Sequence, residues 1–326
     1  MEYRKLGKSD LNVSVLSLGG NVFGHFCDKD ETKRIIDKAL ELGINMIDTA
    51  DVYSNGVSEE YVGNAIRNDR QKWIIATKVG VHSPVLSKHT GKFEYILKSV
   101  EQSLKRLNID CIDLYQMHHY DPSTLPEETL DAMNRLVEQG KIRYFGVSNY
   151  SSNQLSKMAD IANRKYRKSV SSIQVPYNIL KREIENEIID ICHDKEIGII
   201  IYGALARGVL GGKYRIGADI PEQSRAFKSD NVKQDLTNEV LTVVESLINF
   251  SELRSRKINE LAIAWALGNK DVSTLVLGTR NIEQIEENAK ALSWKLSADE
   301  EIELDKLIGV RSKFNDVSLG YFDPQV

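Results

Sequence analysis

Cysteine is scarce in this chain of 326 residues, which contains only three. Cys27, Cys111 and Cys192 are too few and too far apart for a disulfide framework or for a zinc site of paired thiolates. We therefore interpret them as free thiols. The chain also lacks an apolar leader behind Met1, and no stretch approaches about 18 uninterrupted apolar residues. The sequence predicts neither export nor a membrane span, and a cytoplasmic protein is the expectation.

Charge of one sign is not in large excess, because the formal net charge is −4. Lysine and arginine are scattered rather than gathered in a stripe, so the sequence does not predict a partner nucleic acid. Apolar residues make up 41% of the chain and charged residues 28%, which is typical of a globular protein with a sizeable core.

Motifs for a separate nucleotide-binding domain or a metal are also missing. The chain has no G-x-G-x-x-G, and Gly7-Lys8-Ser9 lacks the earlier glycine of a phosphate-binding loop. His118 and His119 are adjacent, and neighbours on a strand point to opposite faces. We therefore predict neither a Rossmann domain nor a metal site.

The sequence does contain a regular alternation of short β-branched runs and longer amphipathic segments, which indicates βα units around a parallel sheet. Eight strands are predicted, at Val15–Leu18, Asn45–Asp48, Trp73–Thr77, Ile112–Met117, Tyr144–Val147, Ser172–Val175, Ile197–Tyr202 and Thr274–Leu277. Eight helices are predicted, at Glu31–Leu42, Glu59–Asn68, Tyr95–Leu107, Glu127–Gln139, Ser152–Asn163, Glu185–Lys195, Ile258–Gly268 and Ile282–Leu292. Eight βα units favour closure into a (β/α)₈ barrel, a TIM barrel that forms one domain over residues 1–326.

Local signals mark helix ends and the segments outside the repeat. Gly43 is expected to stop the first helix in a left-handed conformation, and Ser58 is expected to cap the second. Residues 1–14 are predicted to form a hairpin that plugs the N-terminal end of the barrel. Residues 206–236, rich in glycine, are predicted to be a long functional loop after the seventh strand. The tail, residues 312–326, is compatible with a pocket cover or with a frayed terminus.

Polar residues that follow the predicted strands are the candidates for chemistry, because the C-terminal strand ends of a barrel build its active site. Each has an ordinary structural explanation when taken alone, but several strand ends converge on one crevice. These residues are Asp48, Tyr53, Lys78, His118, His119, Ser148, Asn149, Gln174 and Tyr202.

These residue types suit the reduction of a carbonyl group. An ammonium at Lys78 would lower the pKa of the Tyr53 phenol, and Asp48 would pair with Lys78 and hold it. His118 would orient the carbonyl oxygen while Tyr53 supplies a proton. The carbon then needs a hydride, which no side chain provides, so a nicotinamide or a flavin is required.

Four segments resemble the aldo-keto reductase superfamily: Gly43-Ile-Asn-Met-Ile-Asp-Thr-Ala-Asp-Val-Tyr53 with Ser58-Glu59, Ala76-Thr-Lys78, Asp113-Leu-Tyr-Gln-Met-His118, and Gly140-Lys-Ile-Arg-Tyr-Phe-Gly-Val-Ser-Asn149. Ala206-Arg-Gly-Val-Leu-Gly-Gly-Lys213 resembles the long loop of its bacterial and potassium-channel-beta-like branches. The resemblance runs to about Leu292. It implies a catalytic tetrad of Asp48, Tyr53, Lys78 and His118, with Tyr53 as the acid.

The resemblance also implies a cofactor site for NADPH. Ser148, Asn149 and Gln174 correspond to residues that bind the carboxamide, and Tyr202 corresponds to the ring that stacks on the nicotinamide. Gly203, Leu205 and Arg207 correspond to further cofactor contacts. Gly278, Thr279, Arg280 and Gln284 correspond to the segment near the 2′-phosphate, and Glu287 and Asn288 to positions near adenine. The chain departs from the family where Tyr202-Gly-Ala-Leu205 and Leu277-Gly278 replace proline-containing segments.

The expected function is therefore NADPH-dependent reduction of an aldehyde or ketone, a sugar or keto-sugar included. A noncatalytic or slow redox-sensing regulator remains as an alternative, and so does a lyase that uses Lys78 as a Schiff-base amine. The expected pocket wall contains Val22, Phe23, Tyr53, Val81, His119 and parts of the tail. The substrate, the reaction direction and the oligomeric state stay open.

Overall fold

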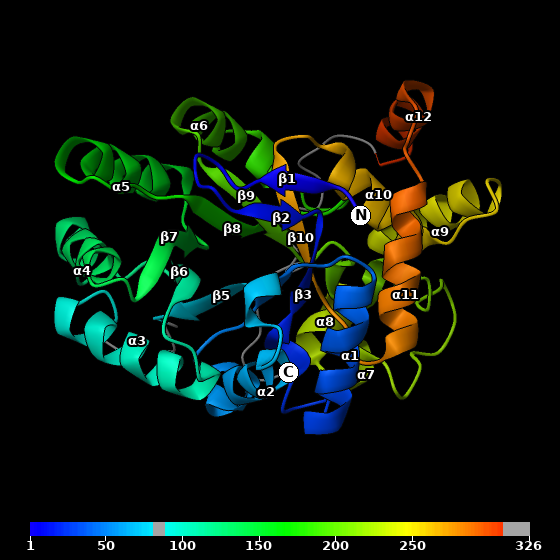
Figure 1. Cartoon of the computed structure of the whole chain (residues 1–326). Helices are drawn as coiled ribbons and strands as arrows, with labels where there is room; N and C mark the ends of the chain where they lie inside the picture. Colours follow the sequence, from blue (N-terminus) through cyan, green and yellow to red (C-terminus); the bar gives the residue numbers. More distant parts are fainter. Residues whose placement is uncertain (81–88, 309–326) are drawn as a thin grey trace.

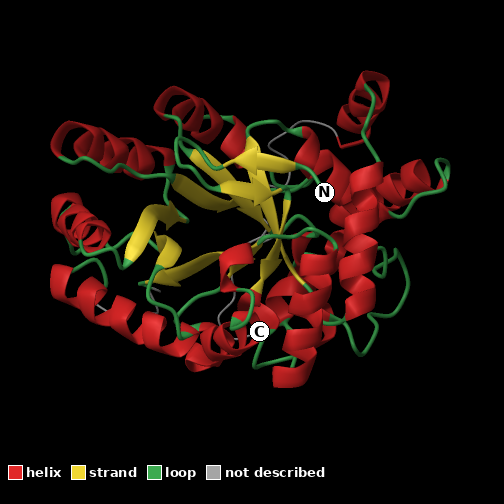
Figure 2. Cartoon of the chain, viewed as in Figure 1, coloured by secondary structure: helices red, strands yellow, loops and turns green. Residues whose placement is uncertain are grey.

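The computed structural model describes residues 1–80 and 89–308. Eight parallel strands close into a barrel in the order β10-β3-β4-β5-β6-β7-β8-β9. Figure 2 shows the strands enclosed by a ring of helices. The barrel strands are β3 (Leu16–Gly19), β4 (Met46–Asp48), β5 (Ile74–Val79), β6 (Ile112–Met117), β7 (Ile142–Ser148), β8 (Ser172–Pro176), β9 (Gly198–Tyr202) and β10 (Val272–Gly278). The predicted TIM barrel and its eight strands are confirmed, with strand ends shifted by at most about two residues.

The helices surround this barrel (Figure 1). They are α1 (Lys29–Glu41), α2 (Val57–Ile66), α3 (Phe93–Leu107), α4 (Pro126–Glu138), α5 (Ser152–Lys165), α6 (Ile188–Lys195), α7 (Arg225–Lys228), α8 (Asp230–Gln234), α9 (Asn238–Glu252), α10 (Ile258–Gly268), α11 (Ile282–Lys290) and α12 (Ala298–Ile308). All eight predicted helices are present, Ile258–Gly268 with the predicted bounds and the others with shifted ends. The sequence prediction missed α9, α12 and the short helices α7 and α8. Among the described residues, no helix is long and apolar enough to cross a membrane.

The two predicted helix-end signals have opposite outcomes. Gly43 follows α1 with a φ of +83°, as expected of a glycine that stops a helix. Ser58 does not cap α2, because that helix already begins at Val57 after Gly56. The Ser58 hydroxyl instead donates to the Gly20 carbonyl at 2.7 Å and lies 2.8 Å from Thr49 Oγ1. Ser58 therefore ties the start of α2 to the loop that follows β3.

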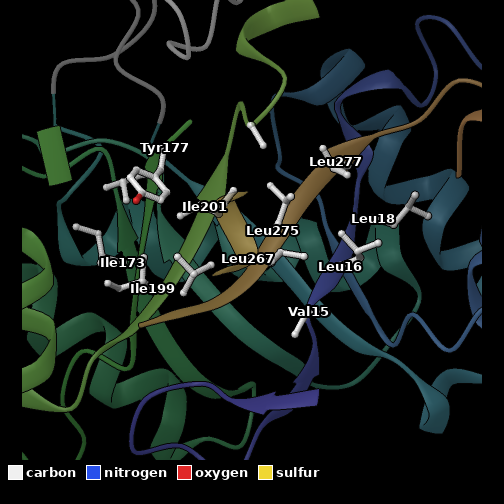
Figure 3. Packing of buried hydrophobic residues seen from close by; sticks show 14 of the residues in the cluster. Val15, Leu16, Leu18, Ile173, Tyr177, Ile199, Ile201, Leu267, Leu275 and Leu277 are labelled. Atoms are coloured by element: carbon white, nitrogen blue, oxygen red, sulfur yellow. The ribbon is translucent and has the colours of Figure 1, made fainter. Parts of the chain in front are cut away.

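Successive side chains of a barrel strand alternate between its two faces, and most of the strands contribute apolar residues on both. The outward layer packs between strands and helices and includes Leu16, Ile199, Ile201 and Leu275 with Leu267 of α10 (Figure 3). The inward layer fills the barrel and combines Met46, Ala76, Leu114, Ile200 and Val276 with Leu6, Leu11 and Val13 from the N-terminal segment. The strands are thus buried on both faces, which explains their nearly continuous apolar sequence.

The N-terminal segment forms the predicted hairpin. β1 (Tyr3–Lys5) pairs antiparallel with β2 (Asn12–Ser14). Arg4 Nη1 donates to the Val272 carbonyl at 2.6 Å, at the start of β10. Gly7 lies so close to Gly198, at the start of β9, that a Cβ there would be 2.5 Å from the Gly198 nitrogen. The hairpin closes the N-terminal end of the barrel (Figure 1), so the opposite end carries the open site.

The long segment after β9 is partly ordered into short elements. A 3₁₀ segment, Ala206–Gly211, is followed by α7 and α8 before α9 begins. Ala206 and Arg207 have positive φ values of 46° and 57°, which are uncommon for residues with a side chain. This backbone carries several residues of the site described next. The predicted tail, residues 312–326, lies outside the described residues.

Candidate active site

The inward-facing side chains of the strands are apolar in the middle of the barrel and polar toward the C-terminal ends of the strands. Asp48 follows Met46 on β4, and Lys78 follows Ala76 on β5, each two residues further along. Gln116 follows Leu114 on β6 in the same way. The two-residue period of a strand thus places a polar layer directly above the apolar filling. This layer is the floor of the candidate site.

Asp48, Lys78 and Tyr53 form one connected group. Lys78 Nζ donates to Asp48 Oδ2 at 2.5 Å and to the Thr49 carbonyl at 2.9 Å. The same nitrogen donates to the Tyr53 hydroxyl oxygen at 3.3 Å. Both charged side chains are almost completely buried, at 0% exposure for Lys78 and 2% for Asp48. The ammonium therefore lies between a carboxylate that neutralises it and a phenol oxygen that accepts from it.

The backbone around Tyr53 turns sharply to bring the ring into the site. Tyr53 begins a 3₁₀ turn, Tyr53–Gly56, in which Ser54 and Asn55 have φ values of 48° and 54°. The Ser54 hydroxyl donates to the Phe23 carbonyl at 2.8 Å, which ties this turn to the loop after β3. Consecutive left-handed residues are costly, and such strain concentrates at functional sites.

The pKa of Tyr53 differs from the sequence prediction. Burial raises the pKa of the Tyr53 phenol above its ordinary value, and the adjacent Lys78 ammonium opposes this without reversing it. Lys78 thus acts in the predicted direction, but burial, which the sequence prediction left out, outweighs it. A raised pKa keeps Tyr53 protonated at neutral pH, which is the form that an acid needs.

Lys78 itself remains charged. Burial acts to lower the pKa of Lys78, but Asp48 and Tyr53 together raise it above the ordinary value. A protonated amine with its hydrogens directed at three oxygens is not a nucleophile. This arrangement counts against Schiff-base chemistry at Lys78.

His118 completes the predicted tetrad. Its ring lies edge-on to the Tyr53 ring with a centroid separation of 5.8 Å. Burial, with the nearby Lys78 charge and His119, holds the pKa of His118 well below its usual range. The imidazole is therefore neutral at physiological pH. A neutral ring can donate one hydrogen bond without adding a second positive charge to the site.

His119 lies beside His118 rather than on the opposite face. The two rings are stacked with centroids 5.1 Å apart and planes 22° apart. The expected alternation is wrong here because β6 ends at Met117, so the histidines lie beyond the strand. The described residues contain no group of three or more histidine, cysteine or acidic side chains arranged to hold a metal ion.

Two glutamine side chains donate hydrogen bonds to the carboxylate of Asp48. Gln116 Nε2 donates to Asp48 Oδ1 at 3.0 Å, and Gln174 Nε2 donates to the same oxygen at 2.8 Å. Gln116 was missed as a site residue, although it lies in the last two residues of the predicted strand Ile112–Met117, at the strand end that builds the site of a barrel. One N–H of the Gln174 amide is used by Asp48, which leaves its second N–H and its carbonyl oxygen for a cofactor amide.

A cavity of about 400 Å³ opens above this floor. Its walls include most of the predicted set: Asp48, Tyr53, His118, Ser148, Asn149, Gln174, Tyr202, Gly203, Leu205, Arg207, Gly278, Arg280, Gln284, Glu287 and Asn288. Lys78 lies beneath the wall. Lys213, Arg225 and Asn259 also line the cavity and were missed. Lys213 belongs to the segment that resembles the family loop, whereas Arg225 carries no local signal.

Two predicted wall residues, Phe23 and His119, and the predicted phosphate ligand Thr279 do not line the cavity. Phe23 is completely buried and does not line the cavity, unlike its neighbour Val22. His119 is also absent from the lining, and Val81 lies outside the described residues. Thr279 is 1% exposed and does not line the cavity, so the structure does not bring its hydroxyl to the predicted phosphate position.

The remaining predicted cofactor residues form an ordered wall. Tyr202 donates its hydroxyl to Asn149 Oδ1 at 2.7 Å, and Asn149 Nδ2 donates to the His118 carbonyl at 3.1 Å. Ser148 donates to the Gln174 carbonyl at 3.0 Å. These bonds fix Asn149 in its left-handed conformation, with a φ of 58°. The side-chain amides of Asn149 and Gln174 and the ring of Tyr202 lie in the same cavity wall as Tyr53. Such a wall suits a nicotinamide, because the amides can bind its carboxamide and the phenol ring can stack on its flat ring.

The charges of the cavity fit a ligand with phosphates. Arg207, Lys213, Arg225 and Arg280 line it, on the segment after β9 and the loop before α11. The two lining carboxylates are both paired with lysines: Asp48 with Lys78, and Glu287 with Lys257 at 2.6 Å. The surplus positive charge favours an anion, and the α11 N-terminus adds to it. The residues thus fit a nicotinamide dinucleotide.

Comparison with known proteins agrees with this geometry. Residues 15–308 match the model of the Aldo/keto reductase family. The chain is 36% identical to a probable voltage-gated potassium channel subunit beta of Arabidopsis thaliana, over 90% of this chain and 91% of that protein. It is 34% identical to an L-glyceraldehyde 3-phosphate reductase of Escherichia coli O157:H7, over 93% and 90% of the two chains. It is 32% identical to the aldo-keto reductase YhdN of Bacillus subtilis, over 94% of each.

The chain therefore belongs to the aldo/keto reductase family, a family of oxidoreductases that generally bind a nicotinamide cofactor. The resemblance inferred from the sequence motifs is confirmed.

Proposed function

We propose that this protein reduces an aldehyde or ketone to the alcohol with NADPH, and that Tyr53 is the proton donor. The observation that carries the proposal is the Tyr53 hydroxyl, which accepts from the buried Lys78 ammonium while its side chain lines the cavity. Because Lys78 donates to this oxygen, it can stabilise the phenolate that remains once Tyr53 has given up its proton.

Each tetrad residue has a separate task in the proposed reaction. Tyr53 and His118 hold the carbonyl oxygen of the substrate between two donors. As the carbon accepts a hydride, which the bound nicotinamide supplies, Tyr53 passes its proton to that oxygen. Lys78 then stabilises the phenolate, because a cation next to an oxyanion favours the charged form. Asp48 fixes Lys78 in position and balances its charge.

The cofactor assignment rests on the cavity wall. Asn149, Gln174 and Tyr202 would hold the nicotinamide end, and Arg207, Lys213 and Arg225 would neutralise the linking phosphates. We assign Arg280 to the 2′-phosphate that distinguishes NADPH from NADH, because its guanidinium makes no ion pair among the described residues. A fork of N–H donors suits a phosphate dianion.

Replacement of Tyr53 by phenylalanine tests the acid role. Tyr53→Phe should lower kcat for aldehyde reduction by about 10²- to 10⁴-fold, which is the usual contribution of general acid catalysis. The Kd for NADPH, titrated by tryptophan fluorescence, should stay nearly constant. Tyr166→Phe is a matched control, since Tyr166 donates to Asp131 on the outside of the barrel. Retention of more than about a tenth of the activity in Tyr53→Phe would refute the acid role.

A redox-sensing regulator is the second candidate, because a relative at 36% identity is named as a potassium channel subunit. Steady-state NADPH oxidation with a panel of aldehydes and ketones separates the two. A kcat of several per second with any of these compounds supports the enzyme, whereas tight NADPH binding without turnover supports the regulator. The cytoplasmic location, the single domain over residues 1–326 and the absence of a nucleic-acid partner stay predictions from the sequence.

A further inference from the structure

Arg280 is an isolated cation in the cavity wall. It lies in the loop between β10 and α11, lines the cavity and is half-buried. Among residues 1–80 and 89–308, no carboxylate pairs with its guanidinium and no hydrogen bond from the guanidinium is formed. Its backbone is well anchored, because the Arg280 nitrogen donates to Gln284 Oε1 at 2.9 Å and its carbonyl accepts from Cys27 Sγ at 3.4 Å.

The side chain is held by an aromatic ring instead of by a carboxylate. The guanidinium carbon of Arg280 lies 3.7 Å from the centroid of the Phe26 ring. Phe26 is not part of the cavity lining, so its ring contacts the guanidinium without occupying the ligand space. An arginine that stacks on an aromatic face is attracted to the ring by its charge.

Phe26 is itself fixed by a tight turn after β3. The backbone nitrogens of Phe26 and Cys27 both donate to the Val22 carbonyl, at 2.9 and 3.1 Å. The Gly24 nitrogen donates to the Cys27 carbonyl at 2.9 Å, and Gly24 has a φ of 80° that favours glycine. His25 packs edge-on against the Phe26 ring, with centroids 4.3 Å apart. The ring is therefore a preformed support.

A ring positions an arginine differently from a carboxylate. A carboxylate would neutralise the guanidinium and occupy its N–H groups, whereas a ring face restricts the side chain and leaves the five donors available. A free arginine side chain samples many rotamers and loses that entropy when it binds a ligand, so a side chain that is already restricted binds the ligand at a lower entropic cost. Cys27 cannot compete as a thiolate, because burial raises the pKa of its thiol to about 11.

We propose that Phe26 is a positioning residue that holds Arg280 ready for the 2′-phosphate and so sets the preference for the phosphorylated cofactor. This inference rests on the proposed function, in which Arg280 meets that phosphate. Phe26 acts on the adenosine end alone, and the tetrad at the floor of the cavity does not depend on it.

The test is binding calorimetry on the full chain with two adenosine fragments, adenosine 2′,5′-bisphosphate and adenosine 5′-monophosphate. Phe26→Leu should weaken the bisphosphate about five- to twentyfold and change the monophosphate less than about twofold. Phe26→Tyr should restore bisphosphate affinity, because the ring returns. The kcat at saturating NADPH should stay constant while the KM for NADPH rises.

Phe250→Leu provides a matched control. The Phe250 ring also carries an arginine, Arg254, with the guanidinium carbon 3.6 Å from the ring centroid. It lies on α9 away from the cavity, so this substitution should leave both fragments unaffected.

The Arg280→Met background separates this inference from the proposed function. If Arg280→Met lowers bisphosphate affinity selectively and Phe26→Leu adds nothing to it, the two residues act as one unit. If Arg280→Met is selective but Phe26→Leu has no effect in the wild type, the positioning role is refuted while the cofactor assignment stands. If Arg280→Met weakens both fragments equally, the phosphate assignment fails first. An equal loss for both fragments in Phe26→Leu would show a merely structural ring and overturn the inference.

Discussion

Removal of the Lys78 charge should cost far more stability than removal of the whole Asp48–Lys78 pair. In Lys78→Met the Asp48 carboxylate remains buried at 2% exposure without its cation. Breaking a buried ion pair by deleting one partner costs about 3–5 kcal/mol, a large part of a typical free energy of unfolding. Methionine fills much of the same space, so this cost comes from the unpaired charge rather than from a cavity.

The double variant Asp48→Asn with Lys78→Met should recover most of that loss. Asp48 Oδ1 accepts from Gln116 and Gln174, and an asparagine carbonyl in the same place can still accept both bonds. We expect the double variant to lie within about 1–2 kcal/mol of the wild type, because a buried pair replaced as a whole is often nearly neutral. The coupling energy of the cycle should then be at least about 3 kcal/mol.

Urea unfolding of the wild type, both single variants and the double variant measures this coupling. Tryptophan fluorescence and far-ultraviolet circular dichroism should give coincident transitions for each protein. Additive losses, with the double variant less stable than either single variant, would show that the 2.5 Å contact contributes no interaction energy and would refute the reasoning.

Two further predictions concern stability. Burial, reinforced by Glu59, raises the pKa of Asp51 to about 7; a raised carboxyl pKa stabilises the fold below the unfolded pKa of about 3.9 and loses that contribution as pH rises through about 7. As the pH rises from 5 to 8.5, Asp51→Asn should therefore become more stable than wild type, by up to about 4 kcal/mol. Thermal unfolding of both proteins at several pH values measures this, and a difference in melting temperature that does not change with pH would contradict the assignment. A Cβ on Gly63 would lie 2.2 Å from the Leu107 carbonyl oxygen, so Gly63→Ala should cost about 1–3 kcal/mol in urea. Gly268→Ala, where the nearest atom would be 3.7 Å away, serves as its control.

The barrel could be predicted because its strands are buried on both faces and their apolar runs stand out between amphipathic helices. Helix α9 was missed because Val240, Val243 and Val244 place β-branched residues inside it, and its start follows a glycine-rich segment. Only its cap, Thr237, whose hydroxyl accepts from the Val240 nitrogen, gave a local signal.

Site residues that lie on a strand or directly after one could be predicted from the sequence. Site residues that reach the cavity through the path of a long loop could not. Asp48 and Lys78 are held by strands, so their convergence follows from the barrel itself. Arg225 reaches the cavity from a short helix in an irregular segment, and no periodicity indicates that approach. The raised pKa of Tyr53 also escaped prediction, because burial is a property of the folded surroundings and not of the neighbouring residues.

The hairpin at the N-terminal end of the barrel links the order of synthesis to the order of folding. Leu6, Leu11 and Val13 are made before every barrel strand, yet the strands that cover them include β9 and β10, which follow almost 200 residues later or more. Barrel closure has the same property, because Leu16 pairs with Leu275. Contacts between distant parts of a chain form slowly, and apolar segments that wait for partners are prone to aggregation. The apolar hairpin residues therefore stay without their barrel partners until β9 and β10 have been made.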